Sequence, residues 1–258
     1  MRIPATRSGS VRYASSDQDL LRAGRYGLPV PVGLSILMPV YNERPTIEAA
    51  IADALSAELP FERELVVVDD GSTDGTRALL QERSWPPGVH VLFHERNQGK
   101  GAAVRSALAH ATGEFAAILD ADLEYRASDL APMLQPLVAG EANVVFGSRA
   151  WQSHSSYGFW YVVGNKLVTF ATNLLYNCWI SDVMTCHKAM RTDLFRSLLL
   201  RERGFAIEPE IAARVLQAGE RIFEVPITYR ARSREEGKKL TALDGLRVLR
   251  TLVRCRVA

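Results

Sequence analysis

The sequence has few cysteines, no excess of one charge and no long apolar run. Three cysteines in 258 residues are too few for a disulfide scaffold, and none lies in the C-x-x-C spacing of a zinc site. A formal net charge of +2 excludes a nucleic-acid binder that works by bulk charge. The best candidate for a membrane span, residues 167–181, includes four Thr or Asn residues. It is shorter than the roughly 20 apolar residues that a bilayer requires, so we expect no transmembrane helix.

The composition is that of a globular protein, with 47% hydrophobic, 23% charged and 8% aromatic residues. The length fits one large domain, or a domain with an appendage. The N-terminus lacks the apolar core of a signal peptide and shows no sustained periodicity. We predict a cytoplasmic protein with a poorly ordered leader over 1–33, a folded domain over 34–230 and a basic tail or helix over 231–258.

Short apolar runs alternate with helical patterns between residues 34 and 150. Such alternation is typical of an α/β fold with a mostly parallel sheet and helices on both faces. The predicted strands are 34–40, 64–70, 88–94, 115–120 and 143–149. Ligands of these sheets bind outside the carboxyl ends of the strands, where this chain carries three acidic loops.

The segment 151–230 has a different pattern. One or two amphipathic helices are expected to about residue 180, followed by a polar hinge over 181–188 and a helix over 190–200. A loop that enters a helix over 204–219 and a last strand over 221–230 complete the predicted domain.

The strongest chemical motif is DADLE, at the end of the predicted strand 115–120. In extended backbone, Asp120 and Asp122 project to the same side, and Glu124 adds a third acid two residues later. Carboxylate oxygens suit Mg²⁺ or Mn²⁺ bound jointly with phosphates. The three residues are therefore our candidate metal ligands. The alternative is a solvated acidic turn that has no ligand.

Two further loops contribute candidate nucleotide contacts. In DDGSTDG, Asp70 is expected to face the crevice and to accept hydrogen bonds from a base or a ribose hydroxyl, and Asp74 to cap a helix. In PVYNE, Tyr41 can stack on a base and Glu43 can bond to it, although an ordinary strand-to-helix loop would have the same composition.

Several cations follow the predicted strands. Arg149 closes a strand on the edge that carries the acids, and Arg232, Lys238 and Lys239 lie in the basic segment after the last strand. Arginine and lysine in such places recognise phosphate. The segment around Lys100 lacks the spacing of a phosphate-binding P-loop and is expected to form a tight turn.

The predicted last helix, 241–257, is basic and amphipathic. Arg247, Arg250 and Arg254 fall in one sector, while Leu246, Leu249, Leu252 and Val253 fall largely opposite. Two interpretations stay open: a helix lying on an anionic membrane surface, and a helix packed on the domain with a hydrated basic face.

Together, these motifs resemble the family 2 glycosyltransferases with the GT-A fold, in particular the branch that makes polyprenyl-phosphate sugars. The matching pieces, which cover about residues 34–250, are PVYNE, VVDDGSTDGT, NQGKGAA, LDADLE, FGSR, SDVMTCHK, EPE and EVPITYRARSREEGKKL. The resemblance implies an enzyme that moves a sugar from a nucleotide-diphosphate sugar to a polyprenyl monophosphate at the inner face of the membrane, with Mg²⁺ or Mn²⁺.

The resemblance also implies roles for individual residues. The nucleotide would lie among Pro39, Tyr41, Glu43, Asp70 and Asp120, and the metal at Asp120, Asp122 and Glu124. Asp122, Arg149, Arg232 and Lys239 would be the catalytic residues, with the three cations near the phosphates.

The catalysis expected from these residues is positioning and charge neutralisation. A lipid phosphate has a second pKa near 6, so its oxygen nucleophile is ionised at neutral pH and needs no base. One displacement would invert the anomeric centre. The alternatives are transfer to a soluble or polysaccharide acceptor, nucleotidyl transfer, and a non-catalytic nucleotide-sugar binding module.

Overall fold

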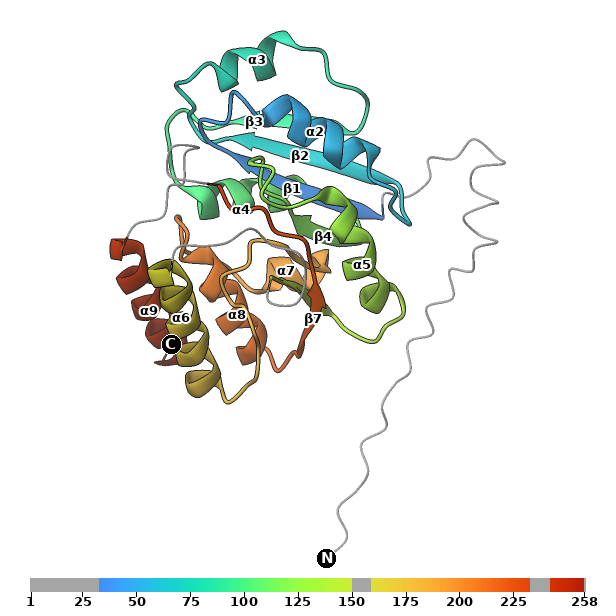
Figure 1. The fold of residues 1–258 in the computed structure, drawn as a ribbon. Coiled ribbons are helices and arrows are strands. Elements are labelled where there is room, and N and C mark those ends of the chain that lie inside the picture. The colour runs from blue at the N-terminus through green and yellow to red at the C-terminus, as the bar shows by residue number, and fades with distance from the viewer. Residues whose placement is uncertain (1–32, 150–158, 233–241, 258) are drawn as a thin grey trace, which may run out of the picture. The chain divides into compact units, whose positions relative to one another are not determined.

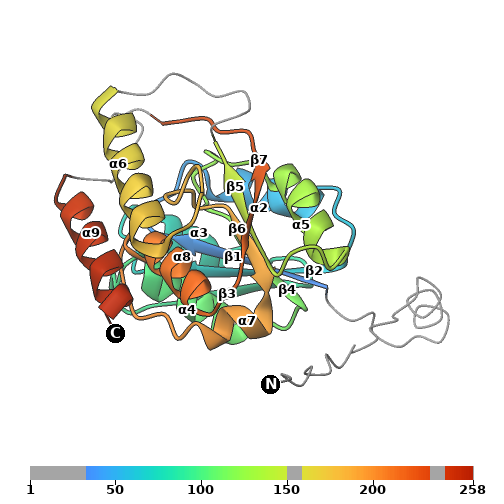
Figure 2. The same cartoon turned by 90° about the horizontal axis from the view of Figure 1, so that it is seen from below.

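The computed structural model describes residues 33–149, 159–232 and 242–257 (Figure 1). Apart from Gly33, the predicted leader lies outside these ranges. The described part is a seven-stranded sheet with helices on both of its faces (Figures 1 and 2). The α/β fold predicted from the alternating pattern is therefore confirmed.

The sheet contains β1 (Leu34–Val40), β2 (Arg63–Asp69), β3 (Val89–Phe93), β4 (Phe115–Ile118), β5 (Val144–Ser148), β6 (Lys188–Arg191) and β7 (Ile222–Pro226). The strand order is β3-β2-β1-β4-β6-β5-β7. Strand β6 is antiparallel to both neighbours, and the other pairs are parallel. The prediction of a helix over 190–200 is wrong at its start, because β6 precedes a short helix, α7 (Thr192–Ser197).

The helices are α2 (Ile47–Ser56), α3 (Thr76–Glu82), α4 (Lys100–His110), α5 (Leu130–Val138), α6 (Phe159–Tyr176), α7, α8 (Ile207–Gln217) and α9 (Ala242–Val257), with a 3-10 turn, η1 (Ala127–Asp129). Side chains of a strand alternate between its two faces. Thus Leu37 packs in the core formed with α4, α8 and α9, while Ile36 packs in the core formed with α2, α3 and α5. All seven residues of β1 are buried, as expected for a central strand covered on both faces.

Helices α6 and α9 lie side by side in both views (Figures 1 and 2), and the Tyr176 hydroxyl of α6 donates to the Leu252 carbonyl of α9 at 2.9 Å. Leu252 is buried, whereas Val253 is 52% exposed. The last helix is thus packed on the domain, as one of the two interpretations predicted. The residues of its predicted apolar side, however, are divided between the core and the surface. None of the described helices is long and apolar enough to cross a membrane.

The directions of the strands determine where their loops meet. Strands β1, β2, β4, β5 and β7 run in the same direction. Strands β4 and β5 are both antiparallel to β6, which lies between them, so they are parallel to each other. Their carboxyl ends therefore lie at one edge of the sheet, which brings the loops after these five strands together.

Candidate active site

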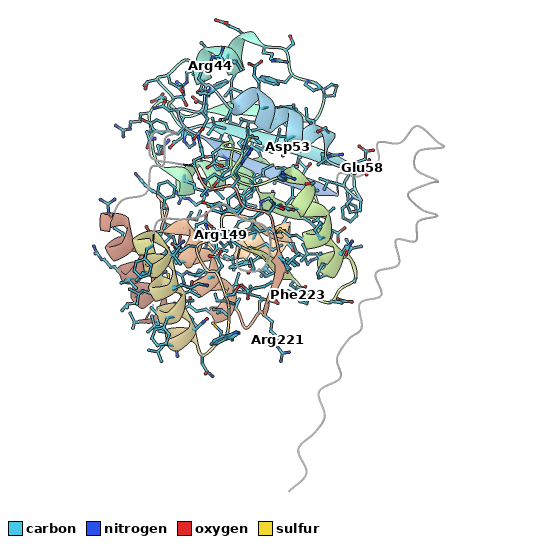
Figure 3. All side chains as sticks on the ribbon, in the orientation of Figure 1. Arg44, Asp53, Glu58, Arg149, Arg221 and Phe223 are labelled. Atoms are coloured by element: carbon cyan, nitrogen blue, oxygen red, sulfur yellow. The ribbon has the colours of Figure 1, made fainter. Side chains whose placement is uncertain are left out.

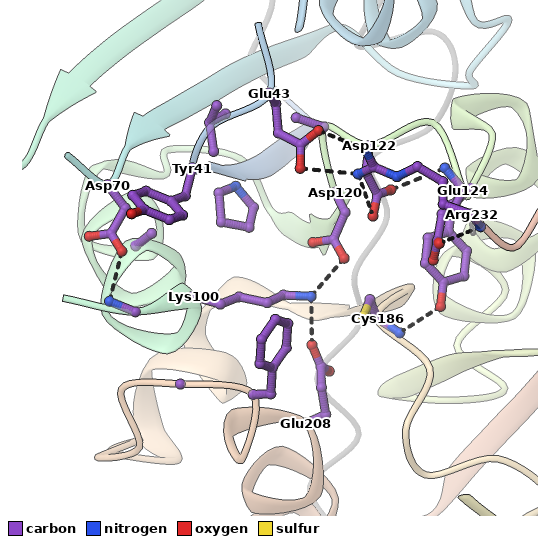
Figure 4. Close-up of a pocket in the computed structure, with 18 of the residues that line it drawn as sticks. Tyr41, Glu43, Asp70, Lys100, Asp120, Asp122, Glu124, Cys186, Glu208 and Arg232 are labelled. Atoms are coloured by element: carbon purple, nitrogen blue, oxygen red, sulfur yellow. Dashed lines mark hydrogen bonds and ion pairs between the residues drawn. The ribbon is translucent and has the colours of Figure 1, made fainter. Parts of the chain in front are cut away.

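A cavity of about 340 Å³ opens at this edge (Figure 4). Its lining includes nine of the ten predicted site residues: Pro39, Tyr41, Glu43, Asp70, Asp120, Asp122, Glu124, Arg149 and Arg232. The tenth, Lys239, lies outside the described residues, as does Lys238. Residues more than 190 positions apart in the sequence thus share one cavity.

The loops after β1 and β2 are joined by hydrogen bonds from backbone amides to side chains. The backbone amide of Asn42 donates to Ser72 Oγ at 2.9 Å, and the backbone amide of Thr73 donates to Asn42 Oδ1 at 2.8 Å. Gly71 has a φ of 75°, and a Cβ there would lie 2.5 Å from the backbone nitrogen of Asn97. Asp74 lies one residue before the N-cap position, which Gly75 occupies. Its carboxylate still accepts from the backbone amide of Thr76, the first residue of α3, and also from that of Arg44.

Asp70 connects this loop pair to α4. Its carboxylate accepts hydrogen bonds from the backbone amides of Gln98 and Gly99, and Oδ1 lies 2.6 Å from His94 Nδ1. The other ring nitrogen of His94 lies 2.8 Å from Ser106 Oγ. No histidine was among the predicted site residues. The feature that could have pointed to His94 is its position directly after β3, which places it beside the end of β2.

The acidic motif does not stay extended. Strand β4 ends at Ile118, and Leu123 has a left-handed φ of 59°, so the expected alternation of side chains fails beyond the strand. Asp120 and Asp122 both line the cavity. The Glu124 carboxylate accepts from the Tyr229 hydroxyl at 2.7 Å and from the Arg232 amide at 2.8 Å.

The predicted set of three metal ligands is therefore not formed. Within the described residues, no group of three or more His, Cys, Asp or Glu is arranged to hold a metal ion. The residues nevertheless fit a cation that is shared with phosphates. Burial, followed by the negative charges of Asp120 and Glu124, raises the pKa of Asp122 to about 7, although Arg232 opposes this. A divalent cation at Asp120 and Asp122 would relieve that repulsion.

Two arginines lie among these acids. The Arg232 guanidinium contacts both Glu43 oxygens at 3.0 Å and Asp122 Oδ2 at 3.2 Å, and so bridges the loops after β1 and β4. Arg149 is held by Asp182: the guanidinium donates from Nε to Oδ2 at 2.6 Å and from Nη2 to Oδ1 at 2.7 Å. Arg149, which is labelled in Figure 3, has an exposed fraction of only 9%.

Lys100 and Glu208 line the same cavity, although neither was among the predicted site residues. Lys100, which the sequence predicted in a tight turn, contacts Asp120 at 2.7 Å and Glu208 at 3.0 Å. Burial would lower the pKa of Lys100, but Asp120, Cys186 and Glu208 hold it well above its usual value. The segment around Arg203 lies directly against the start of α4. A Cβ on Gly99 would approach the Arg203 carbonyl oxygen to 2.4 Å.

Residues 35–199, more than half of the chain, match the model of a protein family described as glycosyl transferase family 2. The chain is 32% identical over 203 residues to glycosyltransferase AglJ of Haloferax volcanii, covering 78% of this chain and 64% of that protein. It is 27% identical over 220 residues to dolichol-phosphate mannosyltransferase of Pyrococcus furiosus, covering 80% and 58%.

A third relative, undecaprenyl-phosphate 4-deoxy-4-formamido-L-arabinose transferase of Sodalis glossinidius, is 33% identical over 116 residues, covering 43% of this chain and 35% of that protein. The chain thus spans less than two thirds of the length of these three curated relatives.

Among solved structures, the chain resembles glucosyl-3-phosphoglycerate synthase of Mycobacterium tuberculosis in complex with Mn²⁺, uridine diphosphate and phosphoglyceric acid. The TM-score is 0.66 at 22% identity, covering 96% of this chain and 84% of that one. At this identity the similarity concerns the fold, and it agrees with the GT-A architecture that the motifs implied. The chain belongs to glycosyl transferase family 2.

Proposed function

We propose that this protein is an inverting, metal-dependent glycosyltransferase. It moves a sugar from a nucleotide-diphosphate sugar to a polyprenyl monophosphate at the inner face of the membrane. The observation that carries the proposal is the meeting of Tyr41, Asp70, Asp122 and Arg232 in one cavity. These four residues come from loops after different strands and combine an aromatic ring, two carboxylates and a guanidinium.

Each group has a task that suits its chemistry. Tyr41 offers a ring face to a base, and the loop that Asp70 orders offers polar groups to the nucleoside. Arg232 and Lys100 neutralise the charge that develops on the departing diphosphate. A divalent cation at Asp120 and Asp122 would supply further neutralisation of that leaving group.

The cavity suits an acceptor that arrives already ionised. Among the described residues that line it there is no histidine, and its carboxylates are held by arginine, lysine or backbone groups. A phosphate monoester with a second pKa near 6 carries its own nucleophilic oxygen at neutral pH. Holding that oxygen in line with the anomeric carbon is then the main contribution of the protein, and a single displacement inverts the anomeric centre.

The names of two relatives support a lipid acceptor, because one is a dolichol-phosphate mannosyltransferase and another an undecaprenyl-phosphate transferase. A surface of this chain supports it independently. On α6, Leu167, Phe170 and Leu174 are 60–71% exposed along one stripe, and Trp179 beyond the helix is 89% exposed. Monomeric soluble proteins rarely expose such a row.

We assign this α6 stripe, with the neighbouring Val253 and Val257 of α9, to contact with an anionic phospholipid surface. Helix α6 contains one lysine and no acid, and α9 contains four arginines and one acid. Pairing two copies through this face would oppose like charges, whereas anionic headgroups complement them.

Transfer of radiolabel tests the proposal. The protein is incubated with a panel of labelled nucleotide sugars, with and without polyprenyl phosphate, and with Mn²⁺, Mg²⁺ or a chelator. We expect organic-extractable label from one donor, dependent on both the lipid phosphate and the cation. Label that appears only on a soluble or polysaccharide acceptor would reject the lipid acceptor, and absence of transfer to any acceptor would favour the nucleotide-sugar binding module.

A further inference from the structure

A line of four alternating charges runs from the interior to the cavity, and Figure 4 shows the three that line the cavity, Glu208, Lys100 and Asp120. Lys188 Nζ lies 2.5 Å from Glu208 Oε2, Lys100 Nζ lies 3.0 Å from Glu208 Oε1, and Lys100 Nζ lies 2.7 Å from Asp120 Oδ2. Lys100, Glu208 and Asp120 line the cavity, whereas Lys188 does not. Lys188 therefore does not meet a molecule bound in the cavity directly, and its ion pair with Glu208 joins it to the residues that do.

Lys188 is the first residue of β6, the antiparallel strand between β4 and β5. Its side chain is completely buried, and its ammonium group donates to the Thr185 carbonyl, approaches the Val183 carbonyl at 3.4 Å and lies 4.7 Å from the centre of the Phe146 ring. A buried ammonium group is costly unless a counter-charge meets it. Glu208 supplies that charge from the first turn of α8, where a carboxylate also suits the helix dipole.

The arrangement decides how much positive charge Lys100 can offer. Glu208 carries one negative charge and contacts two ammonium groups, and Lys188 compensates it from the interior. Lys100 is therefore not needed as the sole partner of Glu208, and its ammonium group reaches the cavity beside Asp120 with an exposed fraction of 9%. Without Lys188, Glu208 would need Lys100 for itself, and the four-residue line would change from neutral to a net charge of −1.

We infer that Lys188 is a positioning residue which, through Glu208, keeps the Lys100 ammonium group available to bind the phosphate groups of the substrates. The inference rests on the proposed function, in which a diphosphate leaves and a phosphate attacks. It deepens that function by naming a phosphate-binding cation of the cavity and the buried residue that controls it.

Calorimetric titration of the whole chain with inorganic pyrophosphate and Mg²⁺ tests this inference directly. Lys188→Met should weaken pyrophosphate binding by about tenfold or more, the loss expected when one charge-assisted contact is taken away. Adding Glu208→Gln to that variant removes the uncompensated carboxylate. It should restore binding to within about threefold of the original protein, because paired residues are not additive.

Met190→Ala, in the same strand, is the matched control, since it removes a buried side chain without changing charge. It should lower the melting temperature and leave pyrophosphate binding unchanged. Lys188→Gln keeps a donor for the Thr185 carbonyl but no charge, and it replaces Lys188→Met if the methionine variant does not fold. If Lys188 has only a structural role, its substitution lowers the melting temperature and leaves pyrophosphate binding unchanged, so Glu208→Gln has no lost binding to restore.

The inference is overturned if the original protein does not bind pyrophosphate, if the charge-removing variants bind it normally, or if the double variant is no better than the single one. These outcomes are separate from those of the transfer assay. If label is transferred to lipid but pyrophosphate binding does not change on substitution of Lys188, only the inference is rejected. If pyrophosphate binding changes as predicted but no label reaches any acceptor, only the proposed function is rejected.

Discussion

His94 Nδ1 lies 2.6 Å from Asp70 Oδ1, on the side of the Asp70 carboxylate that faces away from Gly99. The histidine is itself held by Ser106 Oγ at 2.8 Å. The carboxylate that orders the loop before α4 is thereby fixed to the helix as well. Because this loop borders the cavity, the relationship connects β3 and α4 to the proposed nucleotide site.

Replacing His94 with alanine should weaken donor binding more than it slows the chemical step. Asp70 would lose one of its three donors, and the 97–99 loop would be less well ordered. We expect the KM for the donor to rise by about tenfold, the effect of one charge-assisted hydrogen bond, with kcat within about threefold of the original. Steady-state kinetics at saturating acceptor check this.

His110→Ala serves as the control, since His110 is exposed at the other end of α4 and contacts only the Ser106 carbonyl among the hydrogen bonds described. It should leave both constants unchanged. A fall in kcat with an unchanged KM for His94→Ala would speak against the positioning of Asp70.

Asp122 and Glu124 should respond differently to loss of charge. Asp122→Asn removes a carboxylate that we assign to the cation and should lower kcat/KM by about 10³-fold, in the range of large electrostatic contributions. Glu124→Gln alters a carboxylate held by Tyr229 and Arg232, so we expect a loss of about tenfold or less and an unchanged half-saturating Mn²⁺ concentration.

Titration of activity with Mn²⁺ after removal of bound metal distinguishes the two carboxylates. The assignment is wrong if Asp122→Asn retains near-original activity with metal supplied. It is also wrong if Glu124→Gln shifts the metal dependence as strongly as Asp122→Asn does.

His187 should make the folded state sensitive to acid. Its side chain is fully buried and its ring stacks on Tyr125 with 5.4 Å between centres, and burial, followed by the charges of Lys188 and Lys100, lowers its pKa to about 4. The unfolded chain takes up this proton near pH 6.5, but the folded chain does so only near pH 4. Stability from this group is therefore complete above pH 6.5 and is lost as the pH falls toward 4.

Between pH 7.5 and 5 the loss should be about 2 kcal/mol in the free energy of unfolding. Urea denaturation at both pH values measures it. His187→Phe keeps an aromatic ring against Tyr125 and should remove that part of the pH dependence, while the part due to carboxylates stays. An equal pH dependence in the two proteins would show that His187 does not bind its proton differently on folding.

The exposed α6 stripe should control binding to lipid. Phe170→Ser with Leu174→Ser removes two apolar side chains that would enter the headgroup layer, and we expect sedimentation with phosphatidylglycerol vesicles to fall by about tenfold or more. Val138→Ser with Phe223→Ser changes two exposed side chains outside α6 and α9, 54% and 43% exposed, and should bind as the original does. Unchanged sedimentation of the α6 variant would reject the assignment.

Much of the cavity could be predicted because the chemically reactive side chains follow directly after the strands. The apolar runs that form β1, β2 and β4 stop just before polar residues, and parallel strands bring those ends to one edge. Arg149 and Arg232 followed the same logic at the ends of β5 and after β7. Contacts between individual side chains could not be predicted in this way. The two hydrogen bonds between Asp182 and Arg149, for example, depend on a loop that has no regular sequence pattern.

The failures have local causes. Strand β6 has four residues and begins and ends with a cation, so neither its length nor its hydrophobicity indicated a strand between β4 and β5. Glu124 was assigned by continuing an extended backbone that in fact turns at Leu123. Lys188 was predicted to lie in the polar hinge 181–188, because the carboxylate that compensates it in the interior, Glu208, lies twenty positions away in the sequence.

The close approach of Gly99 to the Arg203 carbonyl, and of Gly101 to the Glu202 carbonyl, leaves no room for a methyl group at either position. Consequently the wall that would meet the leaving diphosphate and the wall that would meet the incoming acceptor are fastened to each other at their base. Exchanging one wall for that of another transferase would disturb the other, so donor and acceptor preference in this chain must be redesigned together.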